Sequence, residues 1–338
     1  MKKYFWASLA LGVLMAAPIW VRAADREKDK PDIDEAMKVI ENHLGDAKQE
    51  QLNEAVEKLL GRPEQSTPRL FGCFADKSKA RDSRMLCVRV LQKMGVPGVS
   101  YQQDLLKIMR DSKEDPLPRV DAATMLLEDH ANTTPAIVKE IKQLAFALYR
   151  EESSKDYVVN RILNRLPSDM DVEQFLVKAA KTEPDQSRRD GLLHILGKRK
   201  SKAVVAMVVS ELKSNKPEHL FSKSRMYLAL GDVGSQEAYD ALVVQLPREK
   251  DHKSHSQILM AIGATKNPRA KALLVKELQK PWQVNTWAAV EGLRFLGDPS
   301  VIPVLESELN RDVPAPSYKE TVRSAISKIK SGDDKPFW

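Results

Sequence analysis

The spacing of glycines along the chain is the sequence feature that most restricts its fold. Gly197, Gly231, Gly263 and Gly297 lie 34, 32 and 34 residues apart, and Gly332 follows 35 residues later. Self-similarity at a fixed period of roughly 20 to 50 residues is typical of proteins built from stacked repeats. The sequence therefore predicts many copies of one structural unit rather than a single globule.

Each period contains two helical patterns. Apolar residues recur at helical spacing after a glycine, as at Val301, Val304 and Leu305, and a second stripe, which includes Val290 and Leu293, ends at a glycine. These stripes are longer than β-strands, which usually have about 5 to 6 residues. The sequence therefore predicts an all-α chain of about nine antiparallel helical hairpins. The expected hairpins are residues 32–60, 64–94, 99–129, 133–165, 169–196, 201–230, 235–263, 267–296 and 299–331.

Several helix starts are marked by a polar residue followed by proline. Thr134, Asn267 and Asp298 each precede a proline. Their side chains can accept a hydrogen bond from a free backbone N–H, and proline at the first helical position lacks only an N–H that would have no partner. We expect the repeat glycines to occupy the left-handed position that ends each preceding helix.

One hairpin cannot bury its apolar stripe, so neighbouring hairpins must stack into a continuous core. We expect a single solenoid over residues 32–331, with Leu293 and Trp287 in the buried stripe. Residues 24–31 form a charged leader and residues 332–338 a short tail. Because neither segment has much apolar surface to bury, both are predicted to be mobile.

The first 23 residues have the pattern of a secretory signal peptide. Two lysines precede an apolar run, Pro18 interrupts that run, and Ala23 is a small residue of the kind that signal peptidase reads. An uncleaved anchor is the alternative, because residues 4–21 approach the lower length limit for crossing a bilayer. With either outcome the chain is predicted to be exported, to the periplasm or the extracellular space.

Composition excludes some classes of function. The chain has 54 Lys and Arg against 47 Asp and Glu, a formal net charge of +7, and loss of residues 1–23 would lower it to +4. That excess is far below what a nucleic-acid-binding protein of this length would carry, so nucleic acid is not an expected partner. The apolar content of 42% is that of a folded chain and not of a disordered one.

Cys73 and Cys87 are the two cysteines of the chain. They lie seven residues on either side of Ala80, in the polar turn of the hairpin 64–94, so they reach the same height on the two helices. Export favours oxidation of such a pair. A disulfide and two ordinary buried thiols both fit the pattern, because packed helices bring Cα atoms within disulfide range only at their tightest contacts.

The turns within the hairpins carry an excess of positive charge. Equivalent turns of a solenoid stack along one edge, so they would form a basic edge able to contact an acidic partner or an anionic surface. The alternative is a solvated edge that only keeps the protein soluble. The residues of this predicted basic edge are Lys178, Lys181, Arg188, Arg189, Lys213, Lys216, Lys223 and Arg225.

Trp282 is a second candidate contact residue. It follows Pro281 in a turn near the C-terminal end. Exposed aromatic side chains are favoured anchors in protein interfaces. Trp282 could equally cover the last hairpins as part of a cap.

The repeat resembles a known family. Residues 296–305 read Leu-Gly-Asp-Pro-Ser-Val-Ile-Pro-Val-Leu, with weaker copies from Leu230 and Ile262. This pattern is similar to the HEAT repeat, in its short bacterial form related to the phycobilisome lyase repeats, and the resemblance is good over residues 186–331. It implies a right-handed α-solenoid used mainly as a binding scaffold, and it implies no single reaction.

The sequence offers no catalytic motif. It contains no phosphate-binding glycine loop, no Gly-x-Ser-x-Gly, no Cys-x-x-Cys and none of the His-Glu dipeptides that di-iron HEAT enzymes need. No catalytic residue, metal or cofactor is predicted. We expect an exported, non-enzymatic scaffold that binds another protein. The alternatives are a module that contacts anionic lipid or acidic polymer of the cell envelope and, third, an enzyme with a site on the concave face.

Overall fold

The computed structural model describes residues 32–42, 49–95, 101–128, 133–214, 221–280, 284–313 and 315–338. The predicted signal peptide and charged leader lie outside these ranges. All regular elements within them are helices, which confirms the predicted all-α solenoid. By its contacts the chain divides into two compact units, Met1–Thr133 and Thr134–Trp338.

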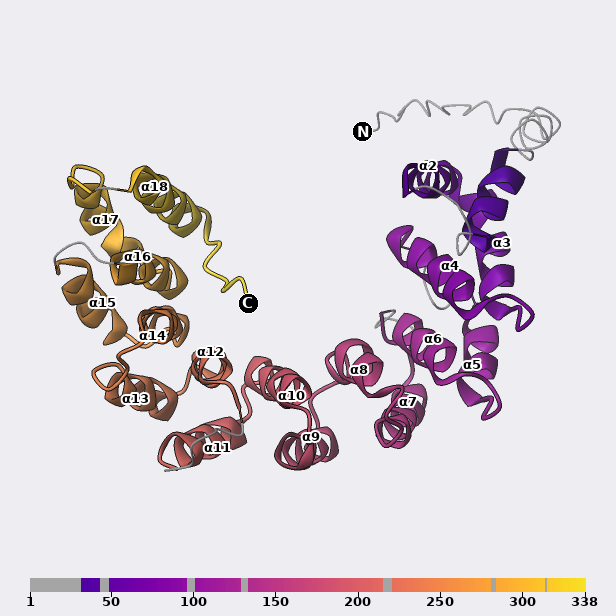
Figure 1. Cartoon of the computed structure of the whole chain (residues 1–338), viewed down its shortest axis with the longest axis horizontal. Helices are drawn as coiled ribbons and strands as arrows, with labels where there is room; N and C mark the ends of the chain where they lie inside the picture. The colour runs from indigo at the N-terminus through magenta and orange to yellow at the C-terminus, as the bar shows by residue number, and fades with distance from the viewer. Residues whose placement is uncertain are drawn as a thin grey trace, which may run out of the picture. The chain divides into compact units, whose positions relative to one another are not determined.

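The N-terminal unit contains three predicted hairpins. Its second helices pack in sequence, α2 against α4 and α4 against α6, and the first helices α3 and α5 pack on their partners α4 and α6. Figure 1 shows α2, α4 and α6 in one row, with α3 and α5 in the other. The helices are residues 32–41, α2 (Gln49–Leu60), α3 (Pro63–Ala75), α4 (Arg81–Lys93), α5 (Gln102–Arg110) and α6 (Pro116–Glu128).

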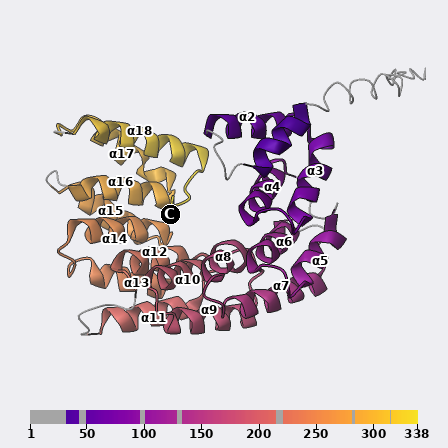
Figure 2. The same ribbon diagram turned by 45° about the vertical axis from the view of Figure 1, so that its right-hand side comes forward.

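The C-terminal unit contains the other six predicted hairpins, and its helices also form two rows. Figures 1 and 2 show α10, α12, α14, α16 and α18 along its inner row and α9, α11, α13, α15 and α17 along its outer row. Its elements are α7 (Pro135–Leu148), α8 (Lys155–Tyr157), η2 (Val158–Leu163), α9 (Met170–Thr182), α10 (Gln186–Lys198), α11 (Lys202–Leu212), α12 (Lys223–Val233), α13 (Gln236–Gln245), α14 (His252–Ala264), α15 (Ala270–Leu278), α16 (Val284–Leu296), η3 (Pro299–Val301), α17 (Ile302–Glu308) and α18 (Pro316–Ser331).

The predicted N-terminal caps form as expected at two of three positions. The Thr134 side chain accepts a hydrogen bond from the backbone N–H of Ile137, and Asp298 accepts one from Ser300. Asn267 accepts from the N–H of Arg269, but this bond closes a turn just before α15 begins. Short polar side chains therefore mark the starts of hairpins, because they satisfy donors that the helix cannot.

The expectation that the repeat glycines end their helices is wrong for Gly197, Gly231 and Gly263, which lie inside helices. It is confirmed for Gly297 and Gly332, which are left-handed and directly follow α16 and α18. Gly231 lies inside α12, and the left-handed residue after that helix is Gly234, with φ 68°. The same offset of three residues separates Gly197 from Lys200 and Gly263 from Lys266, whose φ angles are 56° and 57°.

Close packing between helices explains why these positions are glycine. A Cβ on Gly263 would lie 1.9 Å from the carbonyl oxygen of Gly292, and a Cβ on Gly231 would lie 3.0 Å from the Cα of Ala261. There is no room for a side chain where α12 meets α14 or where α14 meets α16. The glycines therefore set the distance between consecutive inner helices, and other residues end the helices.

The hairpin of residues 267–296 departs from this register. Gly297 does have a left-handed φ of 70° and follows α16 directly. The residue three positions earlier, equivalent to the packing glycines, is Arg294, which is 2% exposed. Gly297 therefore follows Gly263 at the regular interval but has a different role. It ends its helix, and the packing position lies three residues earlier.

The tail, residues 332–338, is not free of the solenoid as the sequence suggested. The rings of Phe337 and Trp338 pack on Phe295 of α16, with centroids 5.3 and 4.9 Å from its ring. Two aromatic residues supply apolar surface that the charge-rich composition of the tail concealed. Their contacts return this segment onto the inner row.

Most side chains of the predicted apolar stripes are buried, but Val304 is partly exposed and Trp287 is exposed. Leu293 is fully buried, as expected. Trp287 is 36% exposed, and its Nε1 donates to Thr321 Oγ1 of α18 at 3.2 Å. The indole therefore lies at the rim of the core, partly exposed, where its N–H reaches a polar partner.

Candidate functional site

Buried glutamates in the hairpin turns join neighbouring hairpins. In the N-terminal unit, Arg84 of α4 makes two hydrogen bonds to Glu114 in the next turn, at 3.0 and 2.9 Å, and both side chains are buried. The guanidinium of Arg84 lowers the pKa of the Glu114 carboxyl, because its hydrogen bonds favour the ionised form. This pair ties the second hairpin to the third.

The turn before α10 repeats the arrangement with a larger network. Tyr149 donates to Glu183 at 2.7 Å, and Lys155 and Arg188 also reach this buried carboxylate. Burial acts to raise the pKa of Glu183, but the hydrogen bond from Tyr149 and the nearby cation Lys155 lower it overall. Burial, followed by that same hydrogen bond, raises the pKa of Tyr149.

Two further turns carry the same motif. Tyr227 and Lys223 of α12 bind Glu249 in the next hairpin at 3.0 and 3.1 Å. Within the last hairpin, Tyr318 donates to Glu308 at 2.7 Å. Glutamates in the turns of both units therefore bind side chains of the neighbouring hairpin or, at Glu308, of the same hairpin.

This pairing changes the meaning of the predicted basic edge. Arg188 binds Glu152, Asp156 and Glu183, and Arg189 donates to backbone carbonyls of the same turn. Lys223 is paired with Glu249, Arg225 is half-buried, Lys213 is exposed, and Lys216 lies outside the described residues. The structure therefore places several of these cations within local networks and not on one continuous charged ridge.

Two of the predicted cations, Lys178 and Lys181, line a groove between the outer helices α9 and α11. One part of the groove has a volume of about 640 Å³ and the adjoining part about 400 Å³, and both parts share Val177, Lys181 and Ala203. Each of these outer helices packs mainly on an inner helix, α9 on α10 and α11 on α12, and hardly on the other, which leaves the space open.

The groove combines an apolar lining with spare positive charge. Its lining includes Met170, which is 73% exposed, and Met207. Lys178 and Lys181 are exposed and make no ion pair with any residue that the structure describes, whereas Glu173 already accepts a hydrogen bond from Ser201. An incoming ligand therefore meets flexible apolar side chains beside two free cations.

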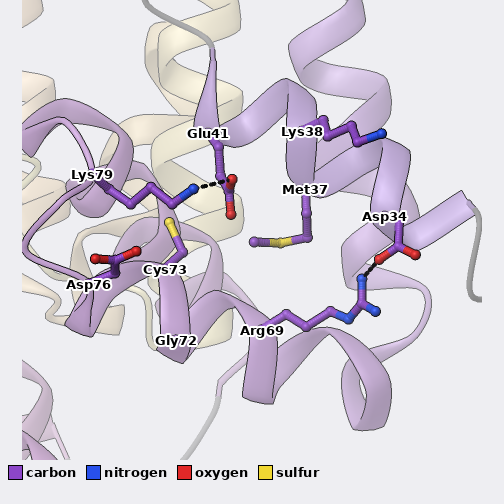
Figure 3. Close-up of a pocket in the computed structure, with 9 residues that line it drawn as sticks. All are labelled: Asp34, Met37, Lys38, Glu41, Arg69, Gly72, Cys73, Asp76 and Lys79. Atoms are coloured by element: carbon purple, nitrogen blue, oxygen red, sulfur yellow. Dashed lines mark hydrogen bonds and ion pairs between the residues drawn. The ribbon is translucent and has the colours of Figure 1, made fainter.

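A second pocket, of about 450 Å³, lies between the helix of residues 32–41 and α3 (Figure 3). Two ion pairs cross it: Arg69 pairs with Asp34, and Lys79 pairs with Glu41 at 2.7 Å. These two pairs join the first hairpin to the second across the gap.

The two cysteines meet beneath this pocket. Cys73 of α3 and Cys87 of α4 form a disulfide, with Cα atoms 6.4 Å apart. That separation lies within the usual range of about 4.4 to 6.8 Å. Both residues are buried, so the pair staples one hairpin and is shielded from the solvent contact that redox chemistry requires.

The described ranges contain no group of three or more His, Cys, Asp or Glu residues able to hold a metal ion. None of their helices combines the length and the apolar character needed to cross a membrane. Trp282, the predicted aromatic contact, lies outside the described residues.

One cluster of side chains on the inner row of helices was not predicted from the sequence. Asp232 of α12 and His194 and Lys198 of α10 lie together, and Trp338 of the tail reaches them. The available signal was the pair Phe337–Trp338, which places two large aromatic rings in an otherwise polar tail. The groove residue Met170 was also missed, although an apolar residue directly after the cap Asp169 faces away from the core stripe.

No protein-family model matches the chain, and no curated protein matches its sequence. Among solved structures, YibA from E. coli aligns over 84% of this chain and 98% of its own, with 16% identity and a TM-score of 0.45. The complex of CpcE and CpcF of phycocyanin lyase from Nostoc sp. PCC7120 gives 77%, 93%, 13% and 0.33. Both TM-scores lie below 0.5, so neither likeness bears on the function of this chain. The chain itself is built of stacked helical hairpins.

Proposed function

We propose that this protein is a non-enzymatic interaction scaffold that binds a segment of another protein in the groove between α9 and α11. The carrying observation is the juxtaposition of an apolar lining with Lys178 and Lys181, both exposed and unpaired among the described residues. Elsewhere along the turn edge, Arg188 and Lys223 are already engaged in ion pairs.

The groove favours an amphipathic partner segment with acidic flanks. Apolar side chains of the partner would lie on Val177, Ala203 and Met207, and carboxylates would reach the two lysines. Helices that lay an apolar face into such grooves are a common mode of peptide recognition, and methionine linings adapt to varied partners.

The proposal includes export of the protein. The pattern of residues 1–23 and the pairing of Cys73 with Cys87 support it, because disulfides persist in oxidising compartments outside the cytoplasm. Fractionation of the native host, followed by mass determination of the N-terminus, tests this part. A protein found in the cytoplasm with residues 1–23 intact would contradict export.

A photo-crosslinking experiment tests the groove. p-Benzoylphenylalanine at the exposed position Ala206 should crosslink a defined partner in the native host, and the mapped partner segment should be apolar with acidic flanks. Lys178→Glu with Lys181→Glu should reduce the affinity of a synthetic peptide of that segment by at least tenfold. The matched control, Lys250→Glu with Lys253→Glu, reverses two exposed lysines elsewhere and should leave binding unchanged.

Equal loss of peptide binding in both double variants would reject the groove as the site. The envelope-surface alternative gives a different result, namely co-sedimentation with vesicles containing phosphatidylglycerol that is lost at high salt and does not depend on Ala206.

A further inference from the structure

The tail makes the contacts of longest sequence range in the C-terminal unit. Hydrogen bonds between hairpins typically join residues about one repeat apart, such as Tyr149 and Glu183, which are separated by 34 positions. Trp338 instead reaches Asp232, which is 106 positions away. Because contacts in a solenoid are normally between neighbours, this crossing of the inner row needs a specific cause.

Polar contacts guide the tail along α16. Asp334 forms an ion pair with Lys266, the left-handed residue after α14. Arg294 donates to the backbone carbonyl of Lys335 at 3.2 Å and is held by Glu291 at 2.7 Å. A buried arginine fixed by a carboxylate offers its remaining donors in a set direction. The surface therefore binds both the backbone of the tail and one of its carboxylates.

Aromatic contacts follow. Phe337 and Trp338 both pack on Phe295, which is itself buried. The guanidinium of Arg294 stacks 4.1 Å from the centre of the Phe295 ring and 5.7 Å from that of Phe337. These contacts combine apolar burial with cation–π attraction. These contacts therefore favour a ligand that carries two adjacent aromatic rings.

The last contact is a buried carboxylate. Trp338 Nε1 donates to Asp232 Oδ1 at 3.2 Å, and Lys198 donates to the same oxygen at 2.8 Å. The Asp232 side chain is 4% exposed, yet its Oδ2 has no hydrogen-bond partner in the described part of the chain. His194 Nδ1, 3.8 Å from Oδ2, also has none there. The cluster therefore keeps polar capacity that the tail leaves unused.

The tail covers this surface only partly. Phe337 is 64% exposed, and Trp338 is half-buried. Segments with so little buried surface detach at a small fraction of the global unfolding free energy. The tail can therefore leave while the helices beneath it stay folded.

We propose that the inner surface formed by Asp232, Lys266 and Phe295 is a peptide-binding site, and that the tail is its tethered resident ligand. The partner is a protein segment that carries a carboxylate followed, about four residues later, by an indole next to a second aromatic ring. It binds by displacing the tail. This site lies on the inner row, apart from the α9–α11 groove, so neither proposal depends on the other.

Tethering makes the competition measurable. A short flexible link gives a ligand an effective concentration on the order of millimolar. A free peptide of the same sequence must therefore compete with a high local concentration in the wild type. Its apparent affinity should rise when the tail can no longer bind.

The test uses a fluorescein-labelled peptide of residues 333–338 and fluorescence anisotropy with the full chain. The variant Phe337→Ala with Trp338→Ala should bind the peptide at least tenfold more tightly than the wild type does. Adding Asp232→Ala should weaken binding at least tenfold, whereas Asp240→Ala, an exposed carboxylate of α13, should not. A peptide with alanine in place of tryptophan should not bind.

Two outcomes would overturn the inference: equal peptide affinity for the wild type and the tail variant, or no binding by a tail variant whose circular dichroism is unchanged. If that variant misfolds, a measurement on the chain with its tail intact still tests the inference. With 5-fluorotryptophan incorporated, the Trp338 resonance, assigned with Trp338→Phe, should move towards its solvent-exposed position in Asp232→Ala. A resonance that does not move would also reject the site.

Discussion

The two units stack the same kind of hairpin in different ways. In the N-terminal unit, neighbouring hairpins are joined by charged side chains, above all Arg84 with Glu114, and one hairpin is stapled by a disulfide. In the C-terminal unit, the inner helices also approach until backbones touch, as at Gly263 and Gly292. The glycine period is clear in the second unit and weak in the first.

The difference shows that the spacing of glycines reports one solution to a packing problem and not the repeat itself. A helix pair with small residues at its crossing gains contact over its whole length. A pair separated by larger side chains needs directional links instead. Polar side chains can supply these links, at the cost of leaving a buried charge if one partner is lost.

The largest effect is expected from breaking the charged link of the N-terminal unit. Arg84→Met leaves Glu114 buried without its cation and should cost about 3 to 5 kcal/mol. Hydrogen exchange should increase in α4 to α6 and stay unchanged in α12 to α16. Adding Glu114→Leu should recover much of the loss, because no charge is then buried alone. If Glu114→Leu does not restore stability, the pair stabilises the unit through its packing and not through its charges.

The matching change in the C-terminal unit is Gly263→Ala. Its Cβ would overlap the Gly292 backbone, so we expect a loss of about 3 kcal/mol, at the upper end for overpacking. Gly72→Ala is the control, because nothing lies within 4 Å of its Cβ position in α3. The control should be neutral or stabilising by up to about 1 kcal/mol. Thermal melts and exchange in α12 to α16 measure both.

Reduction of the disulfide should affect only the N-terminal unit. Opening a loop of 14 residues should cost about 3 kcal/mol by loop-closure entropy. Cys73→Ala with Cys87→Ala should give a similar loss without reductant. Mass spectrometry after alkylation, with and without reduction, checks the bridge in protein from its native compartment. Two alkylated thiols in the unreduced sample would contradict it.

The smallest expected effect is a difference between the two units in how their stability depends on pH. Burial, and then the nearby Arg225, lower the pKa of His194 from its ordinary 6.5. The unfolded chain therefore binds this proton more readily, and the C-terminal unit should lose stability as pH falls through 6.5.

The N-terminal unit lacks such a histidine among its described residues. Its Glu114 has a lowered pKa, so the stabilisation from Arg84 is present above the ordinary value of 4.5 and is lost as pH falls through the lower, folded value. Exchange at pH 7, 5.5 and 4 should show this order of loss. His194→Gln should remove the step near pH 6.5 alone, and a step that persists in this variant would assign it elsewhere.

Much of the fold could be predicted from the sequence because helix formation is local. Periodic apolar residues predicted the paired helices, and Thr134 and Asp298 predicted starts that the structure confirms. Of the candidate site, the sequence identified Lys178 and Lys181 but not their setting. Their companions Arg188 and Lys223 look the same in the sequence, and the structure shows them paired.

Local sequence is enough to specify the two-helix period, the caps and most of the buried stripe, because these depend on residues within one or two turns of each other. Three features follow only from the tertiary structure. They are which glycines lie between packed helices, which charged side chains form ion pairs with neighbouring hairpins, and where Trp338 lies. These outcomes depend on how each hairpin is rotated and displaced against the next, which brings together residues 34 or even 106 positions apart. Local patterns carry no record of that geometry.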